Sequence, residues 1–162
     1  MLSQKVQDAL NAQINAEMYS SYLYLAMAIH CDAINLTGFG RWMRLQSKEE
    51  MEHAMKILEY IIERRGRPQL KQINSPPVSW DTPVAVFEDT MKHEEEVTGM
   101  INRLVELAAS EKDHATCNFL QWFVSEQVEE EARADAILQR ARLVAGSPNG
   151  LFMLDHQLGS RS

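Results

Sequence analysis

The sequence predicts an all-α fold: a bundle of four long helices, a long connection between the second and third of them, and a short fifth helix. Apolar residues recur at steps of three and four through four long stretches, which is the period of an amphipathic helix. Only 7 Gly and 5 Pro occur in 162 residues, and they cluster between those stretches. The connection at residues 67–82 holds three of the prolines and is long enough to run beside a whole helix.

Composition favours one domain over residues 1–162, because 45% hydrophobic and 24% charged residues are ordinary for a globular protein of this length. The net charge of −7 does not favour a nucleic-acid partner. The longest nearly apolar run, 22–29, is too short to cross a bilayer, and the first residues lack a signal-peptide core. Cys31 and Cys117 have no metal-type spacing, so we expect free thiols and a cytoplasmic protein without membrane contact.

The first long helix is expected at residues 3–31. Its inward-facing line is apolar except for one acid near the middle. The line reads Val6, Leu10, Ile14, Glu17, Ser21, Tyr24 and Ala28. Residues 22–29 are apolar on almost every side, whereas a helix of a small bundle should keep one face in water. We therefore expect this segment to be buried against another subunit.

The second helix is expected at residues 38–65, because Gly66 and Pro68 are typical of a helix end. Its inward line reads Phe39, Met43, Gln46, Glu50, His53, Ile57 and Tyr60. The connection at 67–82 reaches roughly 50 Å when extended. A helix of about 28 residues is roughly 42 Å long. The connection can therefore return along the bundle and leave the second and third helices parallel, since a floppy loop of that length is unusual.

The third helix is expected at residues 83–110, because Thr82 can cap it and Pro83 suits its first position. Its inward line reads Phe87, Met91, Glu94, Thr98, Ile101, Val105 and Ala108. The fourth helix is expected at 113–145, and its line reads Leu120, Phe123, Gln127, Glu130, Ala134, Ile137 and Ala141. A short fifth helix is expected at about 148–158.

Charged and amide side chains interrupt all four apolar lines near the middle of each helix. They are Glu17, Glu50, His53, Glu94, Gln127 and Glu130. Helices packed side by side bring their midpoints into one layer, so these groups should converge inside the bundle. Buried carboxylates without partners become protonated or destabilise the fold by several kcal/mol. No Lys or Arg lies on the four lines, so a metal ion is the source of positive charge that the pattern favours.

Glu50 and His53 are three residues apart, so one helix presents a carboxylate and an imidazole on the same face. Taken singly, each polar residue in the layer is more often structural or solvated than a ligand. The layer repeated on four helices is what favours a metal centre. Oxygen-rich ligands with one imidazole suit iron or manganese, with zinc as a competitor.

The number of ligands fits two metal ions. They divide as Glu17 with His53 on the first ion, Glu94 with Glu130 or Gln127 on the second, and Glu50 bridging the two. A pair of Fe(II) ions can reduce dioxygen by two electrons. Tyr24 lies two turns from Glu17 on the same face, where it can orient a ligand by hydrogen bonding or supply an electron.

With these motifs the sequence resembles the ferritin family, specifically its bacterial non-haem branch. The resemblance covers nearly the whole chain and is carried by the stretch from Glu17 to Tyr24, by Glu49-Glu50-x-x-His53, by His93-Glu94 and by Ser125-Glu126-Gln127-x-Glu129-Glu130. It implies a ferritin-like four-helix bundle, a cage of 24 subunits and storage of ferric mineral.

The resemblance also implies three iron positions. The first position would use Glu17, Glu50 and His53. The second would use Glu50, Glu94 and Glu130, with Gln127 nearby. The third would use Glu49, Glu126, Glu129 and Glu130. Glu49, Glu126 and Glu129 occur only in the third position. They flank the inward-facing lines, so from the residues alone they are equally compatible with a solvated surface.

We therefore expect an iron-storage subunit that oxidises Fe(II) with dioxygen or hydrogen peroxide, with Tyr24 and Glu50 taking part in catalysis. Bacterioferritins and rubrerythrins carry a second Glu-x-x-His in the last long helix, which is absent here. This favours a centre that passes iron onward. No haem is expected, although Met51 keeps a haem-binding bacterioferritin as the first alternative. The others are a purely structural helical shell and a bundle oxygenase or peroxidase.

Overall fold

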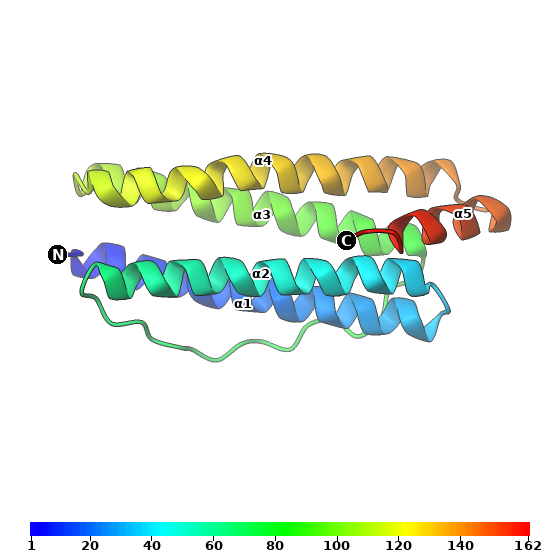
Figure 1. Ribbon diagram of the computed structural model, residues 1–162, viewed down its shortest axis with the longest axis horizontal. Coiled ribbons are helices and arrows are strands. Elements are labelled where there is room, and N and C mark those ends of the chain that lie inside the picture. Colours follow the sequence, from blue (N-terminus) through cyan, green and yellow to red (C-terminus); the bar gives the residue numbers. More distant parts are fainter.

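The computed structural model describes residues 1–162, and its only regular elements are five helices. They are α1 (Gln4–Ala33), α2 (Thr37–Glu63), α3 (Pro83–Ser110), α4 (His114–Leu143) and α5 (Pro148–Leu158). The four long helices lie side by side as an elongated bundle, with α5 at one end (Figure 1). The predicted all-α bundle with a short fifth helix is confirmed, although individual helix ends differ from the expected ones by one or two residues.

The connection between α2 and α3 runs along the outside of the bundle from one end to the other (Figure 1). As a result α2 and α3 point in the same direction, as the length of the connection predicted. Polar side chains of α1 hold it in place: Gln7 Oε1 accepts from Arg67 N at 2.9 Å, Asn11 Oδ1 accepts from Gln69 N at 2.9 Å, and Asn15 Nδ2 donates to the Gln72 carbonyl at 3.0 Å.

The start of α2 is capped by another helix. The side chain of Thr82 caps the start of α3, as predicted, because its Oγ1 atom accepts a hydrogen bond from Ala85 N at 3.0 Å. Leu36, which precedes α2, offers no such oxygen, and the Phe39 amide instead donates to Asp155 Oδ1 of α5 at 2.9 Å. A Cβ on Gly38 would lie 1.7 Å from the Asp155 carbonyl oxygen. The missing side chain of Gly38 thus lets α5 dock tightly on α2.

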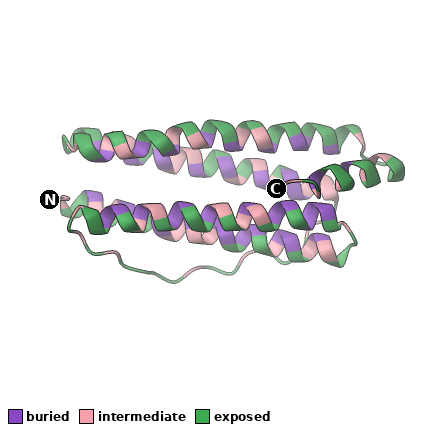
Figure 2. Cartoon of the chain, in the orientation of Figure 1, coloured by how far each residue is buried: buried purple, intermediate pink, exposed green.

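Buried residues lie on the faces that the helices turn toward one another (Figure 2). They form two apolar clusters, one of 15 residues at the α5 end, around Phe39 and Phe87, and one of 13 residues at the opposite end, around Ile57 and Phe123. Polar residues of all four long helices lie between these clusters. The apolar clusters therefore bracket the layer that the sequence predicted.

The predicted inward lines of α1, α2 and α4 are buried throughout. The line predicted for α3 was wrong at three positions: Met91, Thr98 and Val105 are only half-buried. The residues that precede them, Thr90, Val97 and Leu104, are buried instead. In each case the two consecutive residues both lie at the edge of the same wide inward face of α3. The twist of the bundle decides which of the two side chains points inward.

Several large apolar side chains remain exposed on a single chain. Tyr22, Leu25 and Ile29 of α1 are 48%, 40% and 61% exposed, although the segment was expected to be buried against another subunit. That burial stays a prediction for the assembled protein. None of the helices combines the length and apolar character needed to cross a membrane.

Candidate metal centre

The polar layer brings together every residue that was predicted for the two inner metal positions. Glu17 comes from α1, Glu50 and His53 from α2, Glu94 from α3, and Gln127 and Glu130 from α4. Each of these residues is at most 6% exposed. Four carboxyl groups and one imidazole therefore share a small space from which water is largely excluded.

The first group of donor atoms belongs to Glu17, Glu50 and His53, whose ligand atoms lie within 4.8 Å of one another. Glu17 Oε1 accepts from Gln13 Nε2 at 2.7 Å, while Glu17 Oε2 has no hydrogen-bond partner. Buried polar atoms in proteins nearly always have a partner, so an oxygen left open here is suited to a cation. The group offers two kinds of donor, carboxylate and imidazole.

The second group consists of Glu50, Glu94 and Glu130, again with ligand atoms within 4.8 Å of one another. Glu50 belongs to both groups, so one carboxyl group can serve two metal ions. Gln46 Nε2 donates to Glu50 Oε1 at 3.1 Å and to Glu130 Oε2 at 2.7 Å. Gln46 therefore aligns the shared carboxyl with its neighbour on α4.

Gln127 and Tyr24 both act on Glu94. Gln127 Nε2 donates to Glu94 Oε2 at 3.2 Å and to Thr98 Oγ1 at 3.2 Å. The Tyr24 hydroxyl donates to Glu94 Oε1. In this arrangement the Nε2 atom of Gln127 holds the Glu94 carboxyl in place, and Tyr24 contacts the same carboxyl from α1.

A third group of donor atoms lies on the α4 side of the centre. His53, half-buried Glu126 and Glu130 have ligand atoms within 4.8 Å of one another. The other two residues predicted for a third position are placed differently. Glu49 pairs with two arginines, and Glu129 is exposed and joins no group of three donor atoms.

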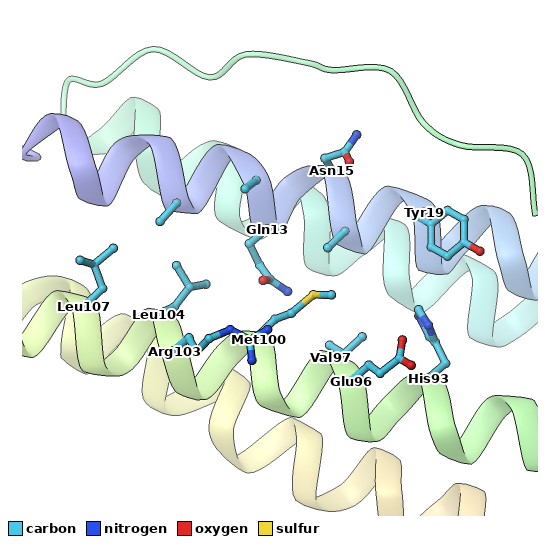
Figure 3. Close-up of a pocket in the computed structure, with 13 residues that line it drawn as sticks. Gln13, Asn15, Tyr19, His93, Glu96, Val97, Met100, Arg103, Leu104 and Leu107 are labelled. Atoms are coloured by element: carbon cyan, nitrogen blue, oxygen red, sulfur yellow. The ribbon is translucent and has the colours of Figure 1, made fainter.

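Two grooves lie on either side of the centre. One, of about 510 Å³, runs between α1 and α3, and Gln13 and His93 point into it (Figure 3). It contains none of the donor atoms, and Gln13 separates it from Glu17. The other, of about 640 Å³, lies between α2 and α4 and is lined by residues that include His53 and Glu126. The centre is thus continuous with the α2–α4 groove through two of its own donors.

Burial is the main cause of the raised pKa values of the carboxyl groups in the polar layer. It raises the pKa of Glu17 to about 8, with a smaller contribution from the charge of Glu50. It raises the pKa of Glu130 to about 7, with a smaller contribution from Glu94. Burial also raises the pKa values of Glu50 and Glu94. Without a metal, the layer therefore keeps protons near neutral pH, and a bound cation would displace them.

Two supporting residues were not predicted to have a role. Gln13 and Gln46 each lie four residues before a metal-layer glutamate and donate to it. The signal was present in the sequence, because side chains four apart meet on a helix and Gln46 lies on the inward-facing line of α2. A buried amide one turn before a buried acid is a pattern that identifies such supporting contacts.

Comparisons with known proteins agree on one family. The sequence model described as "Ferritin-like domain" matches residues 7–144. The chain is 45% identical over 161 residues to a bacterial non-heme ferritin from Bacteroides fragilis, covering 99% of this chain and 100% of that protein. It is 40% identical over 158 residues to a bacterial non-heme ferritin from Campylobacter jejuni, covering 98% and 95%. Among solved structures, an open pore ferritin from the archaeon Archaeoglobus fulgidus aligns with a TM-score of 0.99 and 51% identity over 100% of both chains.

The raised pKa values predict that the metal-free protein loses stability as pH rises. In the unfolded chain these carboxyl groups titrate near 4.5, whereas folded Glu130 and Glu17 titrate near 7 and 8. The folded state binds more protons between these values, so its stability is complete below about pH 4.5 and is lost as pH rises through about 7 to 8. The expected slope is up to ~1.4 kcal/mol per pH unit for each carboxyl.

Chemical unfolding of the metal-free protein across this pH range measures the slope. Glu17→Gln should make the slope shallower, because an amide does not titrate. Stability that increases with pH over the same range would contradict the prediction.

Proposed function

This chain belongs to the ferritin family, and from that premise we propose that it stores iron and oxidises Fe(II) at the centre described above. The observation that supports an oxidising centre is the position of Glu50, whose donor atoms take part in two adjacent groups. A shared carboxylate can hold two iron ions next to each other. Two adjacent Fe(II) ions together supply the two electrons that one molecule of dioxygen needs to become hydrogen peroxide.

The proposed division of ligands follows the geometry. Glu17 and His53 bind the first iron, Glu94 and Glu130 bind the second, and Glu50 bridges them. Iron is the substrate here, and these side chains supply up to four negative charges against two divalent cations. The ligand set is rich in oxygen with one nitrogen, which suits Fe(II). Gln127, which was predicted as a possible ligand, is better placed to hold Glu94.

The reaction consumes two Fe(II), one dioxygen and two protons, and it yields two Fe(III) and one hydrogen peroxide. When hydrogen peroxide is the oxidant, it accepts two electrons and two protons and yields two molecules of water. Glu50 keeps the two iron ions adjacent so that both electrons reach one oxidant. Tyr24, buried against Glu94, orients that ligand and can donate a further electron.

The product Fe(III) is proposed to leave through the α2–α4 groove. His53 and Glu126 line this groove, and with Glu130 they form the third group of donor atoms. The groove carries further acids, Glu52 and Glu59, on the same face of α2. A third iron position is proposed here, as a transit position for Fe(III) and not as a resting site for Fe(II). Acidic groups along the groove would then receive ferric ions and support the growth of a ferric oxyhydroxide mineral.

The relatives give no support to the haem-binding alternative, because those at 40–45% identity are named non-heme ferritins. Met51, the residue that suggested haem, lines the α2–α4 groove beside His53. We propose a protein that carries no haem and works in the cytoplasm.

We also propose that 24 chains assemble into a cage that holds the mineral. Exposed apolar residues on α1 and on α5, where Phe152 and Met153 are 74% and 72% exposed, are suited to contacts between subunits. The native mass of the purified protein should therefore equal that of 24 chains of 18.5 kDa. A monomer or dimer at micromolar concentration would contradict the cage.

Replacing Glu50 and His53 together by alanine should slow aerobic Fe(II) oxidation at least about 100-fold, because both inner iron positions lose a ligand. The initial rate is measured from Fe(III) absorbance after adding two Fe(II) per chain. Glu63→Ala is the matched control, since Glu63 is exposed at the end of the same helix, does not line the α2–α4 groove and belongs to none of the donor groups. Oxidation by the double variant at the parent rate would contradict the proposed centre.

A further inference from the structure

The chain beyond α5 continues in the direction of α5 and ends beside α2 (Figure 1). The guanidinium of Arg161 donates to the Trp42 carbonyl at 3.2 Å, to Gln46 Oε1 at 3.1 Å and to Glu49 Oε2 at 2.7 Å. It also lies 4.5 Å from the ring centroid of Trp42, and its side chain is only 14% exposed. Three acceptors and one aromatic face therefore hold this arginine in a defined place on α2.

The position of α5 places Arg161 there. Asp155 of α5 caps the start of α2 through the Phe39 amide, and Gly38 allows the close approach of the two helices. Arg41 Nε of α2 donates to the Arg161 carbonyl at 3.1 Å. The segment from Asp155 to Arg161 is thus attached to α2 at both ends, and the guanidinium of Arg161 is directed at Glu49.

Arg161 touches the inner centre through Gln46. The Oε1 atom of Gln46 accepts from Arg161, which leaves its Nε2 atom to donate to Glu50 and Glu130. A cation on one side and two carboxyl oxygens on the other define the orientation of the amide. Arg161 is therefore a positioning residue for the shared carboxyl Glu50.

Two arginines pair with the carboxylate of Glu49. Its Oε2 atom accepts from Arg161 at 2.7 Å and from Arg133 at 3.1 Å. Both contacts are charge-assisted hydrogen bonds, which are stronger than those between neutral groups. Oε2 is therefore occupied by two guanidinium groups, and their positive charges repel a metal ion from the carboxylate.

Glu49 lines the same groove as His53 and Glu126, the donors of the third group. The remaining member, Glu130, is 2% exposed, and its Oε1 atom has no hydrogen-bond partner and lies 3.6 Å from Arg133 Nη1. Arg133 is therefore common to Glu49 and Glu130. The open oxygen of Glu130 marks a position for a cation, and the two arginines keep one neighbouring carboxylate away from it.

We propose that Arg161 controls how many iron ions the centre binds. With the tail docked, Glu49 is bound to arginine and the chain holds two irons. When the tail withdraws, Glu49 joins Glu126 and Glu130 in binding a third Fe(II) at the α2–α4 groove. This inference rests on the proposed function, because it takes the two inner positions to be iron sites.

Anaerobic titration of the metal-free cage with Fe(II), followed by calorimetry, counts the sites without oxidation. The parent protein should saturate at two Fe(II) per chain and Arg161→Gln at three. The double variant Glu49→Gln/Arg161→Gln should return to two. A general loosening of the tail would not depend on Glu49, so the double variant separates control of this ligand from a merely structural effect.

Arg142→Gln is the matched control, because Arg142 pairs with Glu88 at 3.1 Å on the surface, where both side chains are 50% exposed. It removes the same charge and should leave two Fe(II) per chain. A chain that ends after residue 160 is the second variant, with three Fe(II) expected, and native mass and circular dichroism check assembly and helix content.

The possible outcomes separate the two proposals. Two Fe(II) per chain in the parent, in Arg161→Gln and in the shortened chain would overturn the control by Arg161 and leave the two-iron centre standing. Three Fe(II) that persist after Glu49→Gln would also overturn it. A parent protein that binds no Fe(II) would overturn the proposed function, and this inference with it.

Discussion

The burial of four carboxyl groups in one layer of an apolar bundle is the constraint on which the rest of this structure depends. Apolar clusters on both sides hold the helices at the spacing that brings Glu17, Glu50, Glu94 and Glu130 together. Side-chain amides satisfy part of the hydrogen bonding, but two buried carboxyl oxygens have no hydrogen-bond partner. Protons or metal ions must neutralise such a layer, because isolated buried charges are costly. The same buried negative charge therefore lowers the stability of the metal-free protein and favours the binding of a metal ion.

The layer is asymmetric, and this asymmetry is suited to moving iron. His53 is the only imidazole in the three groups of donor atoms, and α4 supplies carboxyl and amide groups alone. The carboxyl groups on the α4 side continue into a groove with further acids, whereas Gln13 closes the α1–α3 side. We propose that ferric ions leave along this series of oxygen ligands. Arg133 and Arg161 lie at the start of that series, where a positive charge opposes an arriving cation.

Much of the fold and the inner centre could be predicted from the sequence, because polar residues that interrupt an apolar helix line must be satisfied in the interior. Glu17 and Glu50 are such residues, and both are placed as expected. On α3 the choice between Val97 and Thr98 was wrong, because both border one wide face and only the packing of neighbouring helices separates them. The role of Arg161 could not be predicted, since it meets Glu49 across 112 positions of sequence through the docking of α5.

The central claim is that the polar layer binds two iron ions that share Glu50. Anomalous diffraction at the iron edge, from crystals loaded with Fe(II) under anaerobic conditions, tests it most directly. The account predicts two iron peaks in the layer, about 3.5–4 Å apart, with Glu50 between them. One ion would contact Glu17 and His53, and the other Glu94 and Glu130. A layer that contains no iron, or a single iron without Glu50 as a ligand, would contradict the account.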